Sequence, residues 1–522
     1  MKTKILTTLV LAFLCLTSCS DDDDAGMAPI MPESKTYPLM SVSDPSIMGT
    51  VTFEKTNNNM TRVKVSLEGT QAGVMHPAHI HMNTAAEGGD IVVSLEPIDG
   101  STGMSTTTFS QLNNGMAITY EDLLNFDGYV NVHKSADDLA TLVAQGDIGQ
   151  NELTMTSKTY ALGSVDVPGI MGEAKFTKRV NGTALIEVML ENTPANGMHP
   201  GHIHMNTAAE GGAIALSLTP VNGATGMSKT QAGMLDNGDM ITYDELLNFD
   251  GYINIHKSAD DLATLVAQGD IGQNELTMTS KTYALGSVDV PGIMGEAKFT
   301  KRVNGTALIE IMLENTPANG MHPGHIHMNT AADGGAIALS LTPVNGNTGM
   351  SKTQAGMLDN GDMITYDELL NFDGYINIHK SADDLATLVA QGDIGQNELT
   401  GEMMSYNLNA VSGSGVMGDA TFYERMNGEA LLVIELMGTM AGDMHPAHIH
   451  MGDVNNPGGI AVSLTQVMGD TGISKTNIAM KDDNAVFGYD DALAFGGYIN
   501  IHKSMADLAT IVAQGDIGSN SN

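Results

Sequence analysis

The chain has 522 residues, with 23 Lys and Arg against 61 Asp and Glu, so its formal net charge is -38. This length exceeds one ordinary domain. The acidic balance, with no basic run beyond the first few residues, excludes a nucleic-acid backbone as a main partner. An apolar fraction of 42% can supply several cores, and 59 Gly, 5% aromatics and no Trp favour turn-rich sheet domains.

The chain begins with the pattern of an export signal. Lys2 and Lys4 precede an apolar run over residues 5–16, which is too short to span a bilayer. The following Leu16-Thr17-Ser18-Cys19 resembles the bacterial lipobox, whose cysteine is lipidated and becomes the mature N-terminus. An ordinary cleaved signal with a free thiol is the alternative.

These residues predict a lipoprotein signal peptide over 1–18 and an acidic tether over 19–36 behind a lipidated Cys19. Ser20 and the aspartates of 21–24 resemble the surface-export signal of some Gram-negative lipoproteins. That resemblance implies an outer-membrane lipoprotein exposed on the cell surface, with a periplasm-facing anchor as the alternative. Contact with the membrane is then expected through the lipid alone.

The rest of the chain repeats one unit four times. Equivalent segments open at a constant interval of 123 residues, at Tyr37, Tyr160, Tyr283 and Tyr406. A unit of this length can bury its own core, unlike a solenoid repeat, so independent beads on a string are expected. The predicted domains are 37–159, 160–282, 283–405 and 406–522.

Each unit shows the alternation of short half-buried strands. Residues 62–67 and 129–133 alternate polar and apolar side chains, and Gly, Asn and Asp mark the turns. The prediction is an all-β chain of four Greek-key β-sandwich or barrel domains. A short helix is expected after the last histidine strand, because Ser135 and Asp138 form a capping-box pattern and Gly146 stands where a helix would end.

All 16 histidines fall at four positions per repeat. They are His76, His79, His81 and His133; His199, His202, His204 and His256; His322, His325, His327 and His379; and His445, His448, His450 and His502.

This distribution predicts one metal site in each repeat. Residues two apart on a strand share a face, so His79 and His81 can direct two imidazoles at one ion while Ile80 and Met82 face the core. His133 ends a second strand on the same outer side. His76 is either a fourth ligand or a group that orients another ligand.

Neutral imidazole suits copper or zinc, and a nearby thioether would favour Cu(I). Met75 and Met82 flank the histidines, although methionines also fill cores. A hydrogen-bonded histidine cluster that pins loops and binds nothing is the alternative interpretation.

The motifs His76-Pro-Ala-His79-Ile-His81 and Tyr129-Val-Asn-Val-His133, with the ending Gly146-Asp-Ile-Gly149-Gln150, resemble the CHRD domain first described in chordin. The resemblance spans nearly the whole unit in each copy. The arginine of that family's Gly-Glu-Ile-Arg-Gly ending is missing here. Because CHRD domains have no well-defined activity, the resemblance implies a fold more than a function.

The same histidines also resemble the copper half-site of Cu,Zn superoxide dismutase, whose copper-binding strand reads His-Gly-Phe-His-x-His. Residues 133–139 resemble that family's Val-His-x-x-Ala-Asp-Asp-Leu motif. The resemblance implies ligand roles for His79, His81 and His133. It implies a ligand-orienting role for Asp137 and its equivalents Asp260 and Asp383, which Ala506 replaces in the fourth copy.

Three departures weigh against dismutase activity. The zinc-loop histidines, the disulfide and the arginine near the end of the repeat are all missing. The net charge of -38 also opposes an anionic substrate and favours cation capture.

The favoured function is therefore metal binding by a surface lipoprotein with four histidine-rich copper or zinc sites, rather than catalysis. A copper-dependent redox enzyme similar to superoxide dismutase is the first alternative. A structural or adhesive array without metal is the second. Four equivalent sites would also give avidity for a bridging extracellular protein or surface ligand.

Overall fold

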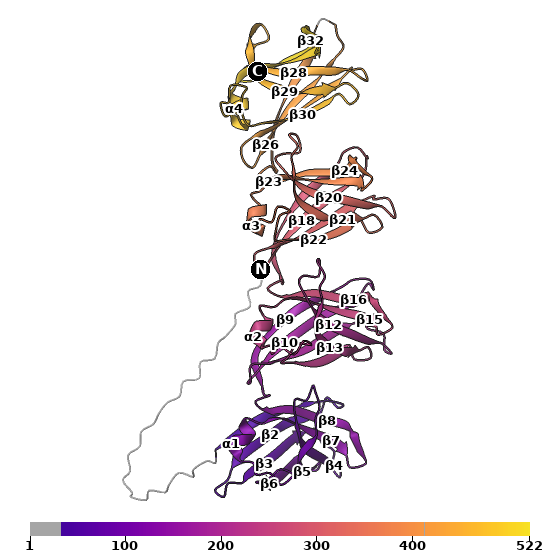
Figure 1. Cartoon of the computed structure of the whole chain (residues 1–522), viewed down its shortest axis with the longest axis vertical. Helices are drawn as coiled ribbons and strands as arrows, with labels where there is room; N and C mark the ends of the chain where they lie inside the picture. The colour runs from indigo at the N-terminus through magenta and orange to yellow at the C-terminus, as the bar shows by residue number, and fades with distance from the viewer. Residues whose placement is uncertain (1–32, 412, 522) are drawn as a thin grey trace, which may run out of the picture. The chain divides into compact units, whose positions relative to one another are not determined.

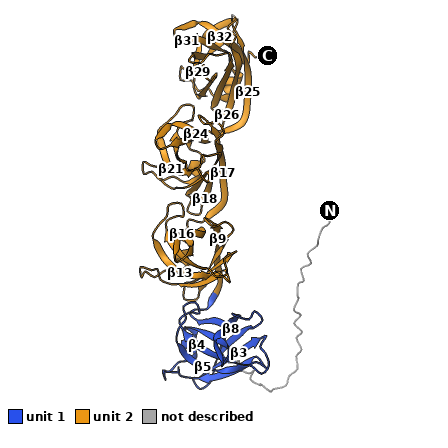
Figure 2. Cartoon of the chain, turned by 90° about the vertical axis from the view of Figure 1, so that its right-hand side faces the viewer, with its two compact units in different colours: residues 1–153 blue, residues 154–522 orange. Residues whose placement is uncertain are grey.

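The computed structural model describes residues 33–411 and 413–521. These residues form four closed antiparallel barrels of eight strands, which follow one another along the chain (Figure 1). The chain divides into two compact units, residues 1–153 and 154–522 (Figure 2). Within the described ranges, the first unit holds one barrel and the second unit holds three.

Each barrel contains eight strands and one short helix. The first barrel comprises β1 (Ser34–Ser41), β2 (Met48–Lys55), β3 (Thr61–Glu68), β4 (Met75–Met82), β5 (Ile91–Asp99), β6 (Met104–Phe109), α1 (Tyr120–Leu124), β7 (Asp127–Ser135) and β8 (Asp138–Gly149). The second comprises β9 (Leu153–Ser164), β10 (Met171–Arg179), β11 (Ala184–Glu191), β12 (Met198–Met205), β13 (Ile214–Asn222), β14 (Met227–Ala232), α2 (Tyr243–Leu246), β15 (Asp250–Ser258) and β16 (Asp261–Gly272).

The other two barrels repeat this order. The third comprises β17 (Leu276–Ser287), β18 (Met294–Arg302), β19 (Ala307–Glu314), β20 (Met321–Met328), β21 (Ile337–Asn345), β22 (Met350–Ala355), α3 (Tyr366–Leu369), β23 (Asp373–Ser381) and β24 (Asp384–Gly395). The fourth comprises β25 (Leu399–Ala410), β26 (Met417–Arg425), β27 (Ala430–Met437), β28 (Met444–Asp453), β29 (Asn456–Met468), β30 (Ile473–Ile478), α4 (Tyr489–Ala494), β31 (Gly496–Ser504) and β32 (Asp507–Gly518).

The strand order in the first barrel is β1-β2-β3-β6-β5-β4-β7-β8, and the pairing of β1 with β8 closes it. The connections from β3 to β4 and from β6 to β7 lead to strands that are not adjacent, and they make the Greek key. They also place β7 beside β4, with Ile80 opposite Val130. The all-β prediction of four repeated barrels, each with a short helix, is confirmed.

The barrel interior is filled by the apolar half of each alternating strand. Val51, Phe53, Ile80 and Val130 have no exposed surface, and they belong to one buried cluster in the first barrel. Equivalent clusters fill the other three barrels. Polar partners of the same strands point outward, because successive side chains on a strand face opposite sides.

The predicted position of the helix is wrong. Ser135 and Asp138 face each other across the tight turn between β7 and β8, and the segment after this turn is a strand. Neighbouring strands pair with β8 on both sides, which outweighs the local helical signal. The observed helix α1 comes before β7 instead, where Thr119 and Asp122 form a capping box.

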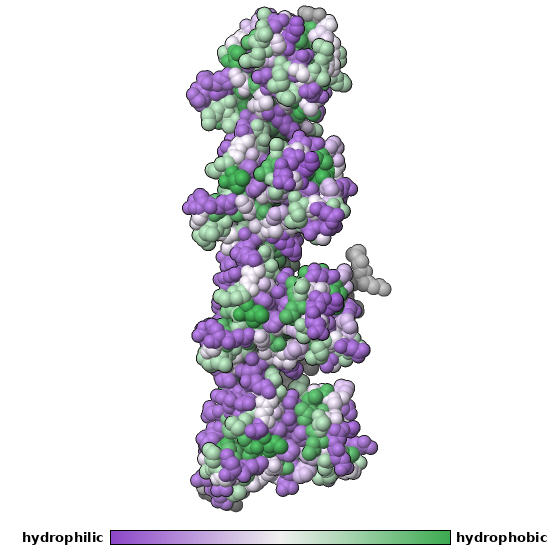
Figure 3. Space-filling model, turned by 45° about the vertical axis from the view of Figure 1, so that its right-hand side comes forward, coloured by the Kyte–Doolittle hydropathy of each residue, from purple (hydrophilic) through white to green (hydrophobic). Residues whose placement is uncertain are grey.

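Met82 also departs from the prediction, because it is exposed rather than packed in the core. The pairing of β4 with β5 shifts register between Ile80 and His81, and such an irregularity breaks the strict alternation of faces. Other exposed methionines include Met155 and Met278. The visible surface accordingly mixes hydrophobic and hydrophilic residues on each barrel (Figure 3).

Buried ion pairs connect successive barrels within the second unit. Arg302 on β18 has no exposed surface, and its guanidinium lies 2.7 Å from the carboxylate of Asp270 on β16. The Arg302 side chain also donates to the carbonyl of Asn274 and to Gln354. Arg425 and Asp393 repeat this contact at 2.8 Å between the third and fourth barrels.

None of the helices in residues 33–411 and 413–521 is long and apolar enough to cross a membrane. The expected signal peptide and the lipidated Cys19 lie outside the described residues, as does nearly all of the tether.

Candidate metal centre

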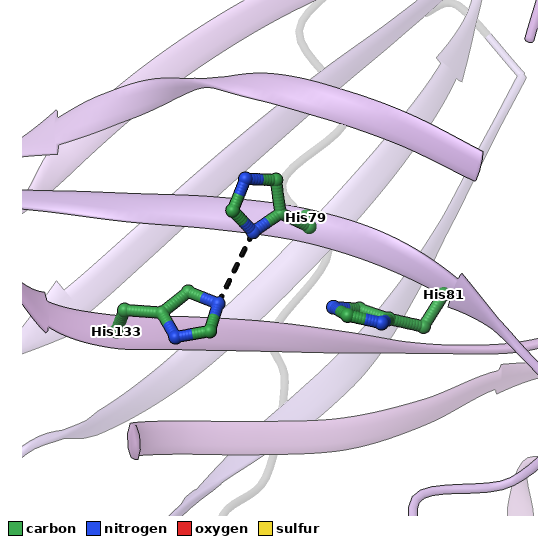
Figure 4. Close-up of side chains that lie close together, drawn as sticks. All are labelled: His79, His81 and His133. Carbon is green, nitrogen blue, oxygen red and sulfur yellow. Dashed lines mark hydrogen bonds between the residues drawn. The ribbon is translucent and has the colours of Figure 1, made fainter. Parts of the chain in front are cut away.

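Strands β4 and β7 bring three imidazoles together on the outside of the first barrel (Figure 4). Ala78 and Ile80 are buried in the core, so the alternate residues His79 and His81 point away from it. His133 on β7 joins them on the same side. Segments more than fifty residues apart in the sequence therefore contribute to one cluster.

The ring nitrogens lie within coordinating reach of one another. His79 Nδ1 and His133 Nε2 are 3.1 Å apart (Figure 4), and one ligand nitrogen from each of the three rings lies within 4.8 Å of the others. Two nitrogens bound at about 2.0 Å to one tetrahedral ion are about 3.3 Å apart. Closing the widest separation thus requires side-chain shifts of about 1 to 1.5 Å.

The same geometry recurs in every barrel. The other three triads are His202, His204 and His256; His325, His327 and His379; and His448, His450 and His502. The short contact between the first and third member of each triad measures 3.1, 3.1 and 3.0 Å. Each of these triads could hold a metal ion.

Backbone carbonyls orient two of the three rings. His133 Nδ1 donates to the carbonyl of Leu139 at 2.6 Å, and His81 Nδ1 donates to the carbonyl of Gly89 at 2.9 Å. A neutral imidazole whose Nδ1 carries the proton has its lone pair on Nε2, which is therefore the atom available to a metal. Tyr129 also stacks on His81, with ring centroids 4.9 Å apart.

The second histidine of the later triads has an unsatisfied nitrogen. The Nε2 atoms of His204, His327 and His450 are buried and have no hydrogen-bond partner among the described residues. A buried nitrogen acceptor without a partner is costly unless a ligand satisfies it. The donor set of neutral imidazoles therefore fits a metal ion.

Burial favours the neutral form of two rings of the first triad, those of His79 and His133. Desolvation lowers the pKa of His79, and the neighbouring His133 and His81 lower it further. Desolvation likewise lowers the pKa of His133, although its hydrogen bond to Leu139 opposes this effect. Because the neutral imidazole is the form that binds a metal, the environment favours the binding form at neutral pH.

His76 does not join the triad. It is 3% exposed, and its Nδ1 donates to the backbone carbonyl of His133 at 3.1 Å. His199 and His445 make the same contact with His256 and His502. The first histidine of these three repeats is therefore placed to fix the backbone of the third ligand strand.

The aspartates expected to orient a ligand lie elsewhere. Asp137, Asp260 and Asp383 are exposed residues of the turn between the last two strands of their barrels. The group that holds His133 Nδ1 is the Leu139 carbonyl, and the corresponding carbonyls of Leu262 and Leu385 hold His256 and His379. Side-chain motifs carry no direct signal for a backbone acceptor, which is why sequence reasoning missed it.

Comparison with known proteins finds a family match for most of the first barrel. Residues 35–138 match the CHRD domain family. No curated protein matches the sequence.

Two solved structures show a weak likeness, each at 9% identity. A tetra-tandem repeat in the extending region of a large adhesion protein is matched over 88% of this chain and 96% of that chain, with a TM-score of 0.11. The BSP domain of a biofilm-associated protein is matched over 94% of this chain and 97% of that chain, with a TM-score of 0.14. TM-scores this low support no conclusion about fold or function.

Proposed function

Because the first barrel is a CHRD domain and three further barrels repeat its strands and its histidines, we propose that this protein is a metal-binding array with one copper or zinc ion per barrel. The observation that carries the proposal is the fourfold recurrence of three imidazoles whose ligand atoms lie within 4.8 Å of one another. A chance cluster of surface histidines would not recur with the same backbone contacts in every barrel.

The chemistry of the site supports a binding role. Three neutral imidazoles leave at least one coordination position for water or an exchangeable ligand, which is a suitable arrangement for copper or zinc. The net charge of -38 raises the local concentration of cations around the chain and so favours their capture.

The array would act outside the cytoplasm. The proposed location is the outer membrane, with Cys19 lipidated and the barrels displayed on the cell surface. Only the N-terminal sequence supports this part of the proposal. Replacing Cys19 by Ala should release the protein from the membrane fraction, and protease added to intact cells should degrade the wild-type barrels. Protease resistance in intact cells would favour a periplasm-facing anchor.

Metal content measured after zinc or copper loading and removal of free ions tests the central proposal. The wild-type mature chain should retain about four ions. A variant that combines His79→Ala, His202→Ala, His325→Ala and His448→Ala should lose them, since each triad then keeps only two imidazoles. These four side chains are only partly buried, and their rings contact other members of the triad, so the barrels should still fold.

A matched control replaces the exposed lysine that follows the third ligand, as Lys134→Ala, Lys257→Ala, Lys380→Ala and Lys503→Ala. This control should retain the same number of ions as the wild type. Equal metal content in the histidine variant and in the wild type would refute the proposal and leave a structural array.

A further inference from the structure

Each of the last three barrels has a carboxylate beside its first metal-ligand candidate. His202 on β12 lies opposite Ser217 on β13, and cross-strand partners share a face of the sheet. Asp236 accepts hydrogen bonds from the Ser217 backbone nitrogen at 3.0 Å and from its hydroxyl at 2.7 Å. Asp359 and Asp482 hold Ser340 and Ser463 in the same way.

The first barrel replaces this carboxylate by an amide. Ser94 lies opposite His79, and Asn113 takes the position that Asp236 has in the second barrel. The Asn113 carbonyl accepts from the Ser94 backbone nitrogen, and its amide nitrogen donates to the Ser94 hydroxyl, both at 3.3 Å. The two side chains have nearly the same shape and contacts, but they differ by one negative charge.

This charge lies near His202, the triad ring for which no hydrogen bond to a backbone carbonyl is found in the described part of the chain. His202 Nδ1 faces His256, so an ion bound between them would leave the N–H of His202 on Nε2, on the other side of the ring. A carboxylate near the outer N–H of a ligand histidine stabilises the charge that the ligand shares with the metal. Asp236 is the acidic group whose position in the fold suits this role.

Asp236 interacts electrostatically with His202, and Asp359 and Asp482 interact in the same way with His325 and His448. The groups that act electrostatically on His79 are His133 and His81, and neither is a carboxylate.

We infer that Asp236, Asp359 and Asp482 are positioning residues that strengthen the binding of a divalent cation in the last three barrels. The protein then has two classes of site, a weaker one in the first barrel and three tighter ones. This inference rests on the proposed metal-binding function. Removing a partner of this kind typically lowers metal affinity by about 10- to 100-fold. Because Asp236 is exposed, we expect the lower end of this range.

Zn²⁺ affinity, measured on full-length chains with one complete triad each, tests the inference. The first chain carries His202→Ala, His325→Ala and His448→Ala, and so retains the site of the first barrel. The second carries His79→Ala, His325→Ala and His448→Ala, and retains the site of the second barrel. Competition with a chelating indicator should show about tenfold tighter binding by the second chain.

Two reciprocal substitutions then exchange the charge with little change in shape. Asn113→Asp in the first chain should tighten Zn²⁺ binding, whereas Asp236→Asn in the second should weaken it, and added salt should reduce both differences. Thermal melts of the metal-free chains should stay within a few degrees of their parents, which separates a change at the site from a change in folding.

The outcomes distinguish this inference from the proposed function. Affinities that stay within twofold of the parent chain after both substitutions would overturn the inference and leave the metal sites intact. Failure of the wild-type protein and of both single-site chains to bind Zn²⁺ would overturn the two together. A loss of affinity in Asn113→Asp as well as in Asp236→Asn would indicate a steric effect and would also refute the inference.

Discussion

Each triad is built from side chains on two strands. In the first barrel, backbone carbonyls of β8 and of the loop between β4 and β5 decide which nitrogen of two triad rings faces the site. The Leu139 carbonyl fixes the tautomer of His133, and the Gly89 carbonyl fixes that of His81. His79 has no such carbonyl contact among the hydrogen bonds of the described chain, and its Nδ1 faces His133. The orientation of the His79 ring therefore depends most on the bound ion and on Asn113, which is hydrogen-bonded to Ser94.

The stability of the metal-free protein should fall on mild acidification. Burial lowers the pKa of eight triad histidines below the ordinary histidine value of 6.5, namely those of His79, His133, His202, His256, His325, His379, His448 and His450. The unfolded chain then takes up protons before the folded chain does. This stabilisation is complete above pH 6.5 and is lost as the pH falls through that value toward the lower folded pKa values.

Urea unfolding of the metal-free protein at pH 7.5 and at pH 5.5 measures this effect. The midpoint should be lower at pH 5.5, and the fall should be smaller in the variant with His79→Ala and its three equivalents, which removes half of the eight groups. An equal fall in both proteins would assign the pH dependence to other groups.

At the scale of elements, the sequence predicted the strands that carry the histidines better than the segment that follows them. His79 and His81 share a face because the alternation of side chains is a property of any strand. The outward direction of His133 followed from its apolar neighbours Val130 and Val132. That β4 and β7 would be neighbours was not fixed by local pattern, because β5, β6 and α1 lie between them in the chain and a crossover leads from β6 to β7.

The segment after His133 shows where local signals fail. Ser135, Asp138 and Gly146 form a helical pattern, but Gly146 serves the closure of the barrel instead. A Cβ on Gly146 would lie 2.1 Å from the backbone carbonyl of Pro38 on β1. The glycine is required by a close approach of two strands that are about a hundred residues apart, and no local window contains this information.

Replacing this glycine by alanine in every barrel should therefore destabilise the protein. Gly269, Gly392 and Gly515 have equally close carbonyls, at 2.1 to 2.2 Å from an added Cβ. Forcing a methyl group into such a contact costs about 1 to 3 kcal/mol per site. The combined variant Gly146→Ala, Gly269→Ala, Gly392→Ala and Gly515→Ala should show a lower melting temperature in calorimetry.

A control on the same strands enlarges side chains that are exposed to solvent. Ala140, Ala263, Ala386 and Ala509 are exposed, and their replacement by Val suits a strand. The control should melt at or above the wild-type temperature. A glycine variant as stable as the wild type would contradict the role of these residues in barrel closure.

At the scale of the whole molecule, the repeat predicted four barrels but not how they are joined. Arg302 and Arg425 each bury a guanidinium against an aspartate of the preceding barrel, so these barrels are not independent beads. The first repeat has Thr56 at the equivalent position, where no repeat precedes it. The presence of this arginine in the third and fourth repeats, and its absence from the first, was a readable sign of the joints within the second unit.

Loss of one such arginine should uncouple two barrels without unfolding either. In the variant Arg302→Ala the carboxylate of Asp270, whose side chain is 9% exposed, loses its guanidinium partner, and breaking a buried pair in this way costs about 3 to 5 kcal/mol. We expect calorimetry of the full chain to show a broader or split transition.

The control is Lys301→Ala, on the same strand as Arg302. It removes the exposed ion pair between Lys301 and Asp367, and it should cost at most about 1 kcal/mol. Because Lys301 and Arg302 are adjacent, equal effects of the two substitutions would show that the joint does not depend on the buried guanidinium.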